Sequence, residues 1–217
     1  MPLKFQLPIV YPITSGNTTP DHILRLVRAA VDAEVPLFQI REKLLPARVL
    51  FELVARAAEL TRGSKTRLLV NDRSDIALAA GADGVHLTTQ SLPVEVVRKI
   101  YGAEFLIGVS THALDEAREA RAAGADFVVF GPVFETESKR VYGPPQGLEK
   151  LAKVARELEQ FPVVAIGGIT LENAGECFHA GARGVAAIRL LSGADQLSSI
   201  VRAIRSKFET GFQDFSR

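Results

Sequence analysis

Short apolar runs alternate with longer amphipathic stretches along the whole chain. Eight runs of three to five residues are rich in Val, Ile, Leu and Phe and contain few polar residues. Runs of this length are too short for helices and are typical of strands buried on both faces of a parallel sheet. We expect these strands at residues 9–13, 37–40, 68–70, 84–87, 105–109, 127–130, 163–166 and 185–188.

Each predicted strand is followed by a stretch whose apolar residues recur at helical spacing. In the first of these, Ile23, Leu24, Val27, Ala30 and Val31 fall on one face of a helix. The other stretches show the same pattern, so strands and helices alternate eight times. We expect helices at about residues 20–31, 46–60, 75–80, 93–100, 114–123, 148–159, 171–180 and 194–208.

A short internal repeat marks three of the turns from a helix into the next strand. Residues 80–83 and 123–126 both read Ala-Gly-Ala-Asp, and residues 180–183 read Ala-Gly-Ala-Arg. The glycine is placed to cap the preceding helix. Eight βα units without a change of composition favour an α/β fold, a single-domain (β/α)8 TIM barrel over residues 1–217, with residues from about 209 as a tail. An open doubly wound sheet is the alternative, but no glycine fingerprint follows the first strand.

Composition narrows the class of protein. The chain is 47% apolar and 24% charged, with a formal net charge of +1, so its charge does not call for nucleic acid or an acidic membrane as a partner. No apolar run is long enough to span a membrane, and the N-terminus does not resemble a signal peptide. Cys177 is the single cysteine, which excludes an internal disulfide. We therefore expect a cytoplasmic protein.

In a barrel the active site lies at the C-terminal ends of the strands, and polar residues gather there in this sequence. Gln39, Arg41 and Lys43 alternate along the end of the second strand, so their side chains are expected to point the same way. Asn71 and Asp72 end the third strand. They could bind a metal or a ligand, or form a turn that caps the next helix.

The later strands add further candidates on the same face. Ser110 ends the fifth strand, although it could also cap a helix, and Thr136 and Lys139 follow the sixth with groups that suit a phosphate. Gly167 and Gly168 end the seventh, where backbone without a β-carbon can approach an anion or simply make a tight turn. The eighth ends at residues 188–189, in the part of this fold that commonly holds phosphate.

Six motifs occur in a fixed order along the chain: Q-I-R-E-K, V-N-D-R, G-A-D-G-V-H-L, I-G-V-S-T-H, G-A-D-F-V-V-F-G-P-V-F-E-T-E-S-K and P-V-V-A-I-G-G-I. Together they resemble the thiamine phosphate synthase/TenI family, nearly end to end. The resemblance implies a TIM barrel. In the synthase branch it implies a Mg²⁺-assisted transferase that condenses hydroxymethylpyrimidine pyrophosphate with hydroxyethylthiazole phosphate and releases pyrophosphate.

The resemblance also implies roles for individual residues. Lys139, Ser110 and Arg41 would be catalytic, with Lys139 offsetting charge on the leaving group, and Asp72 would be a Mg²⁺ ligand. The pyrophosphate would meet the second and third strands, and the thiazole phosphate would meet the backbone after the seventh and eighth. The implied substrate-binding residues are Gln39, Arg41, Lys43, Asn71, Ser110, Thr136, Lys139, Gly167, Gly168, Ile188 and Arg189.

Two positions depart from the synthase pattern. Ser91 stands where the second Mg²⁺ carboxylate is usual, and a hydroxyl is a weaker ligand for this cation. Arg189 stands where a phosphate-binding serine is usual, and it could bind phosphate bidentately or fill the pocket. A weakened metal site is therefore expected.

Two other readings stay open alongside the synthase. Residues 88–93 resemble the TenI branch, whose characterised activity is thiazole tautomerisation, but its catalytic histidine position is Pro132 here. His86 and His112 lie on the same face and could move a proton, although structural hydrogen bonding suits them better. The remaining alternative is a non-catalytic phosphate-binding barrel. The sequence leaves the oligomeric state open, with a homo-oligomer among the alternatives.

Overall fold

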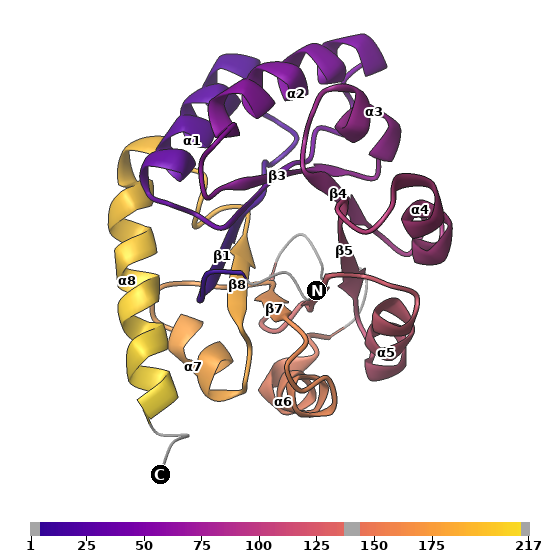
Figure 1. Cartoon of the computed structure of the whole chain (residues 1–217). Helices are drawn as coiled ribbons and strands as arrows, with labels where there is room; N and C mark the ends of the chain where they lie inside the picture. The colour runs from indigo at the N-terminus through magenta and orange to yellow at the C-terminus, as the bar shows by residue number, and fades with distance from the viewer. Residues whose placement is uncertain (1–4, 137–143, 214–217) are drawn as a thin grey trace.

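The computed structural model describes residues 5–136 and 144–213, and it is a barrel of parallel strands surrounded by helices (Figure 1). The strands are β1 Ile9–Pro12, β2 Leu37–Ile40, β3 Arg67–Asn71, β4 Gly84–Leu87, β5 Leu106–Thr111, β6 Phe127–Phe130, β7 Val163–Ile166 and β8 Gly184–Ala187. The order of hydrogen-bonded neighbours is β1-β8-β7-β6-β5-β4-β3-β2, and every pair is parallel. The predicted α/β fold class is confirmed.

The barrel closes between β1 and β2. There a single bridge joins Ile13 to Gln39, and the Thr14 N–H donates to the Gln39 carbonyl at 3.0 Å. Each of the other seven neighbouring strand pairs is held by three or four registered residue pairs. The first and last strands in the ladder therefore meet at a seam with few backbone hydrogen bonds.

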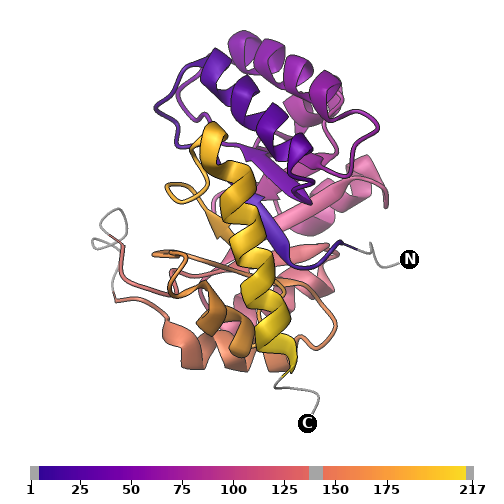
Figure 2. The same cartoon turned by 90° about the vertical axis from the view of Figure 1, so that its left-hand side faces the viewer.

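The helices alternate with the strands as expected. They are α1 Pro20–Asp32, α2 Ala47–Thr61, α3 Ser74–Ala79, α4 Val94–Tyr101, α5 Leu114–Ala122, α6 Gly147–Glu157, α7 Ala174–His179 and α8 Ala194–Gln213. Helix α8 packs between α1 and α7 and completes the outer ring (Figure 2). None of the helices within the described ranges is both long and apolar enough to cross a membrane.

Two helix boundaries differ from the prediction by three residues or more. Helix α7 begins at Ala174, three residues late, because the Asn173 side chain accepts from Thr170 N–H at 2.8 Å and donates to the Gly168 carbonyl at 2.9 Å. These bonds hold a turn in place of the first helical residues. Helix α8 continues to Gln213, so the residues from 209 to 213 belong to a helix rather than to a tail.

Side chains fill the inside of the barrel. The Phe127 ring lies in the middle, with its centroid 5.7 Å from that of Tyr11 and 6.1 Å from that of His86. Gly108 leaves room for it, since a β-carbon there would lie 2.3 Å from Phe127 Cζ. A second and larger apolar layer lies between the strands and the helices. The interior is therefore a packed core rather than an open channel.

The repeated turns join neighbouring strands at the opposite end of the barrel. Asp83 accepts from the Leu68 N–H at 2.8 Å, and Asp126 accepts from the Ile107 N–H at 2.7 Å. Each aspartate thus caps the start of the strand beside its own. The backbone N–H of Asp83 and of Asp126 also donates to the carbonyl of that neighbouring residue, Leu68 and Ile107. In the third copy the Arg183 N–H makes the equivalent backbone bond to the Val163 carbonyl, but no carboxylate is present.

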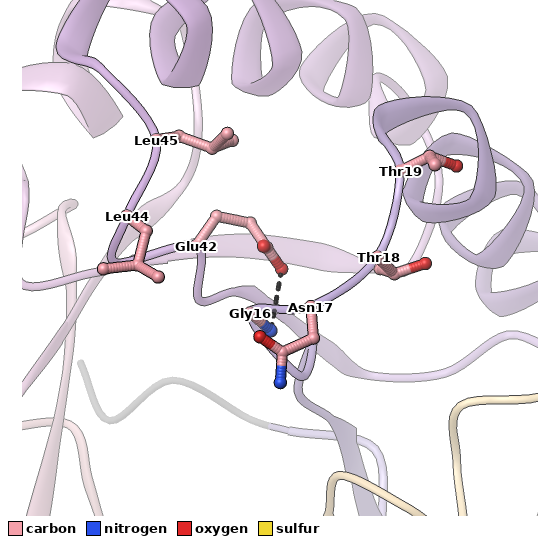
Figure 3. A pocket seen from close by; sticks show the side chains of 7 residues that line it. All are labelled: Gly16, Asn17, Thr18, Thr19, Glu42, Leu44 and Leu45. Atoms are coloured by element: carbon pink, nitrogen blue, oxygen red, sulfur yellow. Dashed lines mark hydrogen bonds between the residues drawn. The ribbon is translucent and has the colours of Figure 1, made fainter.

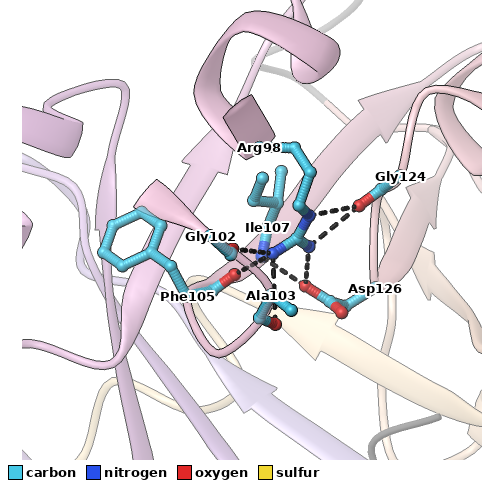
Figure 4. Close-up of polar contacts among 7 residues, drawn as sticks. All are labelled: Arg98, Gly102, Ala103, Phe105, Ile107, Gly124 and Asp126. Atoms are coloured by element: carbon cyan, nitrogen blue, oxygen red, sulfur yellow. Dashed lines mark hydrogen bonds and ion pairs between the residues drawn. The ribbon is translucent and has the colours of Figure 1, made fainter. Parts of the chain in front are cut away.

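Arg98 of α4 reinforces the second of these turns (Figure 4). Its guanidinium donates to Asp126 Oδ2 at 2.7 Å and to the Gly124 carbonyl at 2.8 and 3.0 Å. It also donates at 2.7 Å to the carbonyls of Gly102 and Phe105. One side chain therefore ties the end of α4 to the turns that lead into β5 and β6.

Candidate active site

Four neighbouring strands bring the predicted polar residues together at the C-terminal end of the barrel. Gln39 lies near the end of β2, Asn71 ends β3, His86 lies in β4 and Ser110 lies near the end of β5. Asn71 and His86 are register partners, so they are directly adjacent. Parallel strands place their C-terminal ends on one face, as the sequence predicts.

Three of these side chains and Tyr11 form a continuous polar chain inside the barrel. Gln39 Nε2 donates to the Tyr11 hydroxyl at 2.8 Å, and that hydroxyl lies 3.4 Å from His86 Nδ1. His86 Nε2 lies 2.8 Å from Ser110 Oγ. Gln39, Tyr11 and His86 are at most 3% exposed, whereas Ser110 is half-buried. The chain therefore runs from the closed interior to the open end.

The buried members of this chain carry no charge near neutral pH. Burial, and secondarily the positive charge of Arg41, lowers the pKa of His86 to about 3. Burial also raises the pKa of the Tyr11 hydroxyl far above its ordinary value, against the effect of the Gln39 hydrogen bond. The imidazole is thus neutral and the phenol is protonated. The expectation that His86 is a hydrogen-bonding residue is confirmed.

The segment after β2 is anchored to the loop after β1. The Arg41 N–H donates to Thr14 Oγ1 at 2.8 Å, and Glu42 Oε1 accepts from the Gly16 N–H at 3.2 Å. Glu42 is 6% exposed, Arg41 is half-buried and Lys43 is exposed. The buried Glu42 carboxylate thus fixes the backbone between the two predicted pyrophosphate-binding cations.

A cavity of about 430 Å³ opens between these two loops (Figure 3). The Glu42 carboxylate reaches across its floor toward Gly16, and Leu44 lies on the side opposite Thr18. The residues that line it are Gly16, Asn17, Thr18, Thr19, Glu42, Leu44 and Leu45. This cavity borders the C-terminal end of the barrel at the seam between β1 and β2.

Asp72 lies directly after Asn71 and is exposed. It adopts φ 63°, and its N–H donates to the His86 carbonyl at 2.9 Å. Ser91, at the position of the second carboxylate, accepts from the Thr88 N–H at 2.8 Å and closes its own turn. Within residues 5–136 and 144–213, no three His, Cys, Asp or Glu side chains group together to hold a metal.

The segment after β6 packs against the end of β7. A β-carbon on Gly167 would lie 2.5 Å from Pro132 Cα, and one on Gly168 would lie 2.6 Å from the Glu135 carbonyl oxygen. Gly167 and Gly168 therefore allow the loop after β6 to pack closely against their backbone. The sequence did not indicate this contact. Thr136 lies at the end of this described segment and is half-buried, whereas Lys139 lies outside the described residues.

Strand β8 ends at Ala187, and Ile188 and Arg189 follow it. Ser192 Oγ donates to the Arg189 carbonyl at 2.8 Å, and the Ser192 carbonyl lies 3.1 Å from His22 Nε2. The loop that leads into α8 is thus fixed to α1. His112 Nδ1 makes a short contact with the Gly131 carbonyl, which confirms a structural hydrogen bond for that histidine as well.

Sequence reasoning missed Tyr11, Thr14 and Glu42. The alternation of Ile9, Tyr11 and Ile13 along the first strand could have indicated that the tyrosine faces the barrel interior. Its partners could not be read from the chain, because they come from β2 and β4.

Known proteins resemble this chain over most of its length. A thiamine-phosphate synthase from Moorella thermoacetica is 44% identical over 93% of this chain and 95% of the relative. One from a Roseiflexus species is 40% identical over 96% of this chain and 89% of the relative. The solved thiamine phosphate pyrophosphorylase from Pyrococcus furiosus is 35% identical, with a TM-score of 0.80 over 94% of this chain and 96% of that one. The family model for thiamine monophosphate synthase matches residues 10–191, and the chain belongs to this family.

Proposed function

We propose that this protein is a thiamine-phosphate synthase, which joins hydroxymethylpyrimidine pyrophosphate to hydroxyethylthiazole phosphate and releases pyrophosphate. The observation that carries the proposal is the 40–44% identity to proteins of that name over more than nine-tenths of the chain. The polar open end of the barrel supports it, since Gln39, Asn71, His86 and Ser110 come from the four neighbouring strands β2 to β5.

The pyrophosphate is assigned to the ends of β2 and β3. Arg41 and Lys43 would bind its oxygens, together with Gln39 and Asn71, and Ser110 would contact the pyrimidine. In the reaction, the bond between the pyrimidine methylene carbon and the pyrophosphate oxygen breaks, and its electron pair leaves with pyrophosphate. Fixed cations such as Arg41 stabilise this departing charge most in the transition state.

The thiazole phosphate is assigned to the other side of the open end. The backbone N–H groups of Gly167, Gly168 and Ile188 would bind it, together with Thr136, Lys139 and Arg189. The N-terminus of α8 also favours an anion near this loop. The thiazole nitrogen then donates its lone pair to the methylene carbon and forms the new C–N bond.

Family membership implies Mg²⁺, and the residues of this chain fit a site that the substrate completes. Asp72 is exposed beside Asn71 and would hold the cation, while the Ser91 hydroxyl is engaged in its own turn. Mg²⁺ is often bound by one or two carboxylates plus substrate phosphates. When bound, the cation would neutralise charge on the leaving pyrophosphate. A single carboxylate predicts weak binding without substrate.

The two alternatives receive less support. Proton transfer in a TenI-type tautomerase would need a free acid or base, but His86 is buried and neutral and His112 contacts the Gly131 carbonyl. Pro132 cannot transfer a proton. A non-catalytic phosphate-binding barrel would have no use for Arg41, Lys43 and Asp72 together.

A direct assay tests the proposal. Purified protein is incubated with both substrates over a range of Mg²⁺ concentrations, and thiamine phosphate and pyrophosphate are both measured. We expect the two products in equal amounts. No thiamine phosphate at any Mg²⁺ concentration would refute the synthase function, and turnover of the thiazole substrate alone would favour the tautomerase.

A further inference from the structure

We propose that Tyr11 and His86 are positioning residues that fix the direction of the Ser110 hydroxyl, so that Ser110 donates its hydrogen bond to an acceptor atom of the substrate. The identity of that substrate as a pyrimidine rests on the proposed function. The hydrogen-bond direction rests on the polar chain from Gln39 through Tyr11 and His86 to Ser110.

The direction begins at Gln39. Its Nε2 is a donor without acceptor capacity, so the Tyr11 oxygen accepts at 2.8 Å. The Tyr11 hydroxyl carries one hydrogen, and His86 Nδ1 is 3.4 Å away in the direction of the chain. Tyr11 and Gln39 are buried, so water does not replace either partner. His86 Nδ1 is therefore an acceptor.

The direction then passes through the imidazole. A neutral imidazole carries one hydrogen, and when Nδ1 accepts, that hydrogen is on Nε2. Nε2 lies 2.8 Å from Ser110 Oγ and donates to it. Ser110 Oγ thus accepts a hydrogen bond from His86 Nε2, and the Ser110 O–H remains available to donate to a partner at the open end of the barrel.

This arrangement has a consequence for recognition. The Ser110 hydroxyl meets the substrate as a donor, so it favours a ring nitrogen with a lone pair and disfavours an N–H at the same place. Unprotonated pyrimidine nitrogens are such acceptors. Tyr11 and His86 therefore influence which ring is bound without touching it.

Nitrogen-15 spectra of the histidine rings of the wild-type protein test the direction of the chain. We expect His86 as the neutral tautomer with hydrogen on Nε2, and the His86→Asn spectrum identifies its signals by their loss. Hydrogen on Nδ1 would reverse the chain and overturn the proposal. The spectrum reports this whether or not the protein makes thiamine phosphate, so it is independent of the proposed function.

Two substitutions test the effect on the substrate. In His86→Gln the side-chain amide reaches the place of Nε2 and can still donate to Ser110, whereas in His86→Asn it reaches the place of Nδ1 and cannot. We expect His86→Asn to raise the KM for the pyrimidine substrate about tenfold, and His86→Gln to stay within about threefold of wild type. The KM for the thiazole phosphate should not change in either variant.

The comparison separates positioning from a general structural effect. Equal increases in the pyrimidine KM for both variants, or equal increases for both substrates, would overturn the proposal. Tyr11→Phe keeps the ring packed beside Phe127 but removes the donor to Nδ1. We expect His86 to populate both tautomers in this variant, and an unchanged spectrum would also contradict the proposed direction.

Discussion

Arg98→Ala is expected to destabilise the barrel although Arg98 lies at the end opposite the substrate. The guanidinium bonds Asp126 and the carbonyls of Gly124, Gly102 and Phe105, all in the turns around β5 and β6. The side chains of Arg98 and Asp126 are 21% and 16% exposed, so solvent screens this pair weakly. Truncation leaves the Asp126 carboxylate with the Ile107 N–H as its remaining hydrogen-bond donor among the described residues.

The expected magnitude follows from this burial. Removing one partner of a buried ion pair costs about 3–5 kcal/mol, and the residual exposure of this pair favours the lower end, about 3 kcal/mol. For a chain of 217 residues that loss corresponds to a decrease in Tm of about 7 °C. The cost arises mainly from the unpaired Asp126 carboxylate.

The pH dependence of the loss provides a specific signature. Burial already raises the pKa of Asp126, in spite of the bonds from Ile107 and Arg98. A raised pKa in the folded state means that stability falls as pH rises from the unfolded value through the folded one. Without Arg98 the folded pKa rises further. The defect should therefore be smaller near pH 4 than at pH 7, where the carboxylate is ionised.

Urea unfolding of wild type and variant at several pH values measures the effect. Arg118→Ala is the matched control, because Arg118 also forms ion pairs, with Asp115 and Glu157, but on the exposed surface. The control should leave the midpoint unchanged. If Arg98→Ala loses no more stability than Arg118→Ala, or if its loss does not depend on pH, the reasoning from the buried carboxylate is wrong.

Four further predictions concern residues at the C-terminal end of the barrel strands, where the candidate site lies. Gly168→Ala should cost at least about 2 kcal/mol in urea unfolding, because φ is 65° and the new β-carbon meets backbone; unchanged stability would contradict the close packing. Folding lowers the pKa of His86 from 6.5 to about 3. Between these pH values the unfolded chain therefore binds more protons than the folded protein. The unfolding free energy should thus fall by about 2 kcal/mol from pH 8 to pH 5 in wild type relative to His86→Gln; parallel pH curves would refute this. Ser91→Asp should lower the Mg²⁺ concentration needed for half-maximal rate and should raise turnover. An unchanged Mg²⁺ dependence would contradict the hypothesis that Ser91 weakens the metal site. Lys139→Ala should reduce kcat about tenfold with the same Tm, whereas Lys150→Ala on α6 should change neither; a large decrease in Tm would instead make Lys139 structural.

The barrel could be predicted from the sequence because its strands are short, mainly apolar runs that alternate with amphipathic helical stretches. The bounds of β2, β4, β6 and β7 match the prediction residue for residue. The errors fall where side chains set the boundary, as Asn173 does at the start of α7. Periodicity reports which face of a segment is apolar and does not report such local bonds.

The candidate site could be predicted in part. The alternation of strands and helices places Gln39, Asn71 and Ser110 on one face without any three-dimensional information. The bonds of Tyr11 to Gln39 and His86 depend on through-space partners up to 75 residues apart, and neither pattern nor spacing contains them. For Gly167 and Gly168 after β7, the sequence indicated that something approaches the backbone where a β-carbon would stand. It did not indicate that the loop after β6 is what approaches.

The sparse seam between β1 and β2 determines where the barrel opens in local fluctuations. Segments with few backbone hydrogen bonds open at the lowest free energy and exchange their amide hydrogens first. The Thr14 amide, bonded across the seam to the Gln39 carbonyl, should therefore exchange with deuterium faster than amides in the β3–β6 ladders. Gln39 also begins the polar chain to Ser110, so the seam and the substrate end share a residue. Occupancy of that end should slow exchange at Thr14, which makes this amide a reporter of ligand binding.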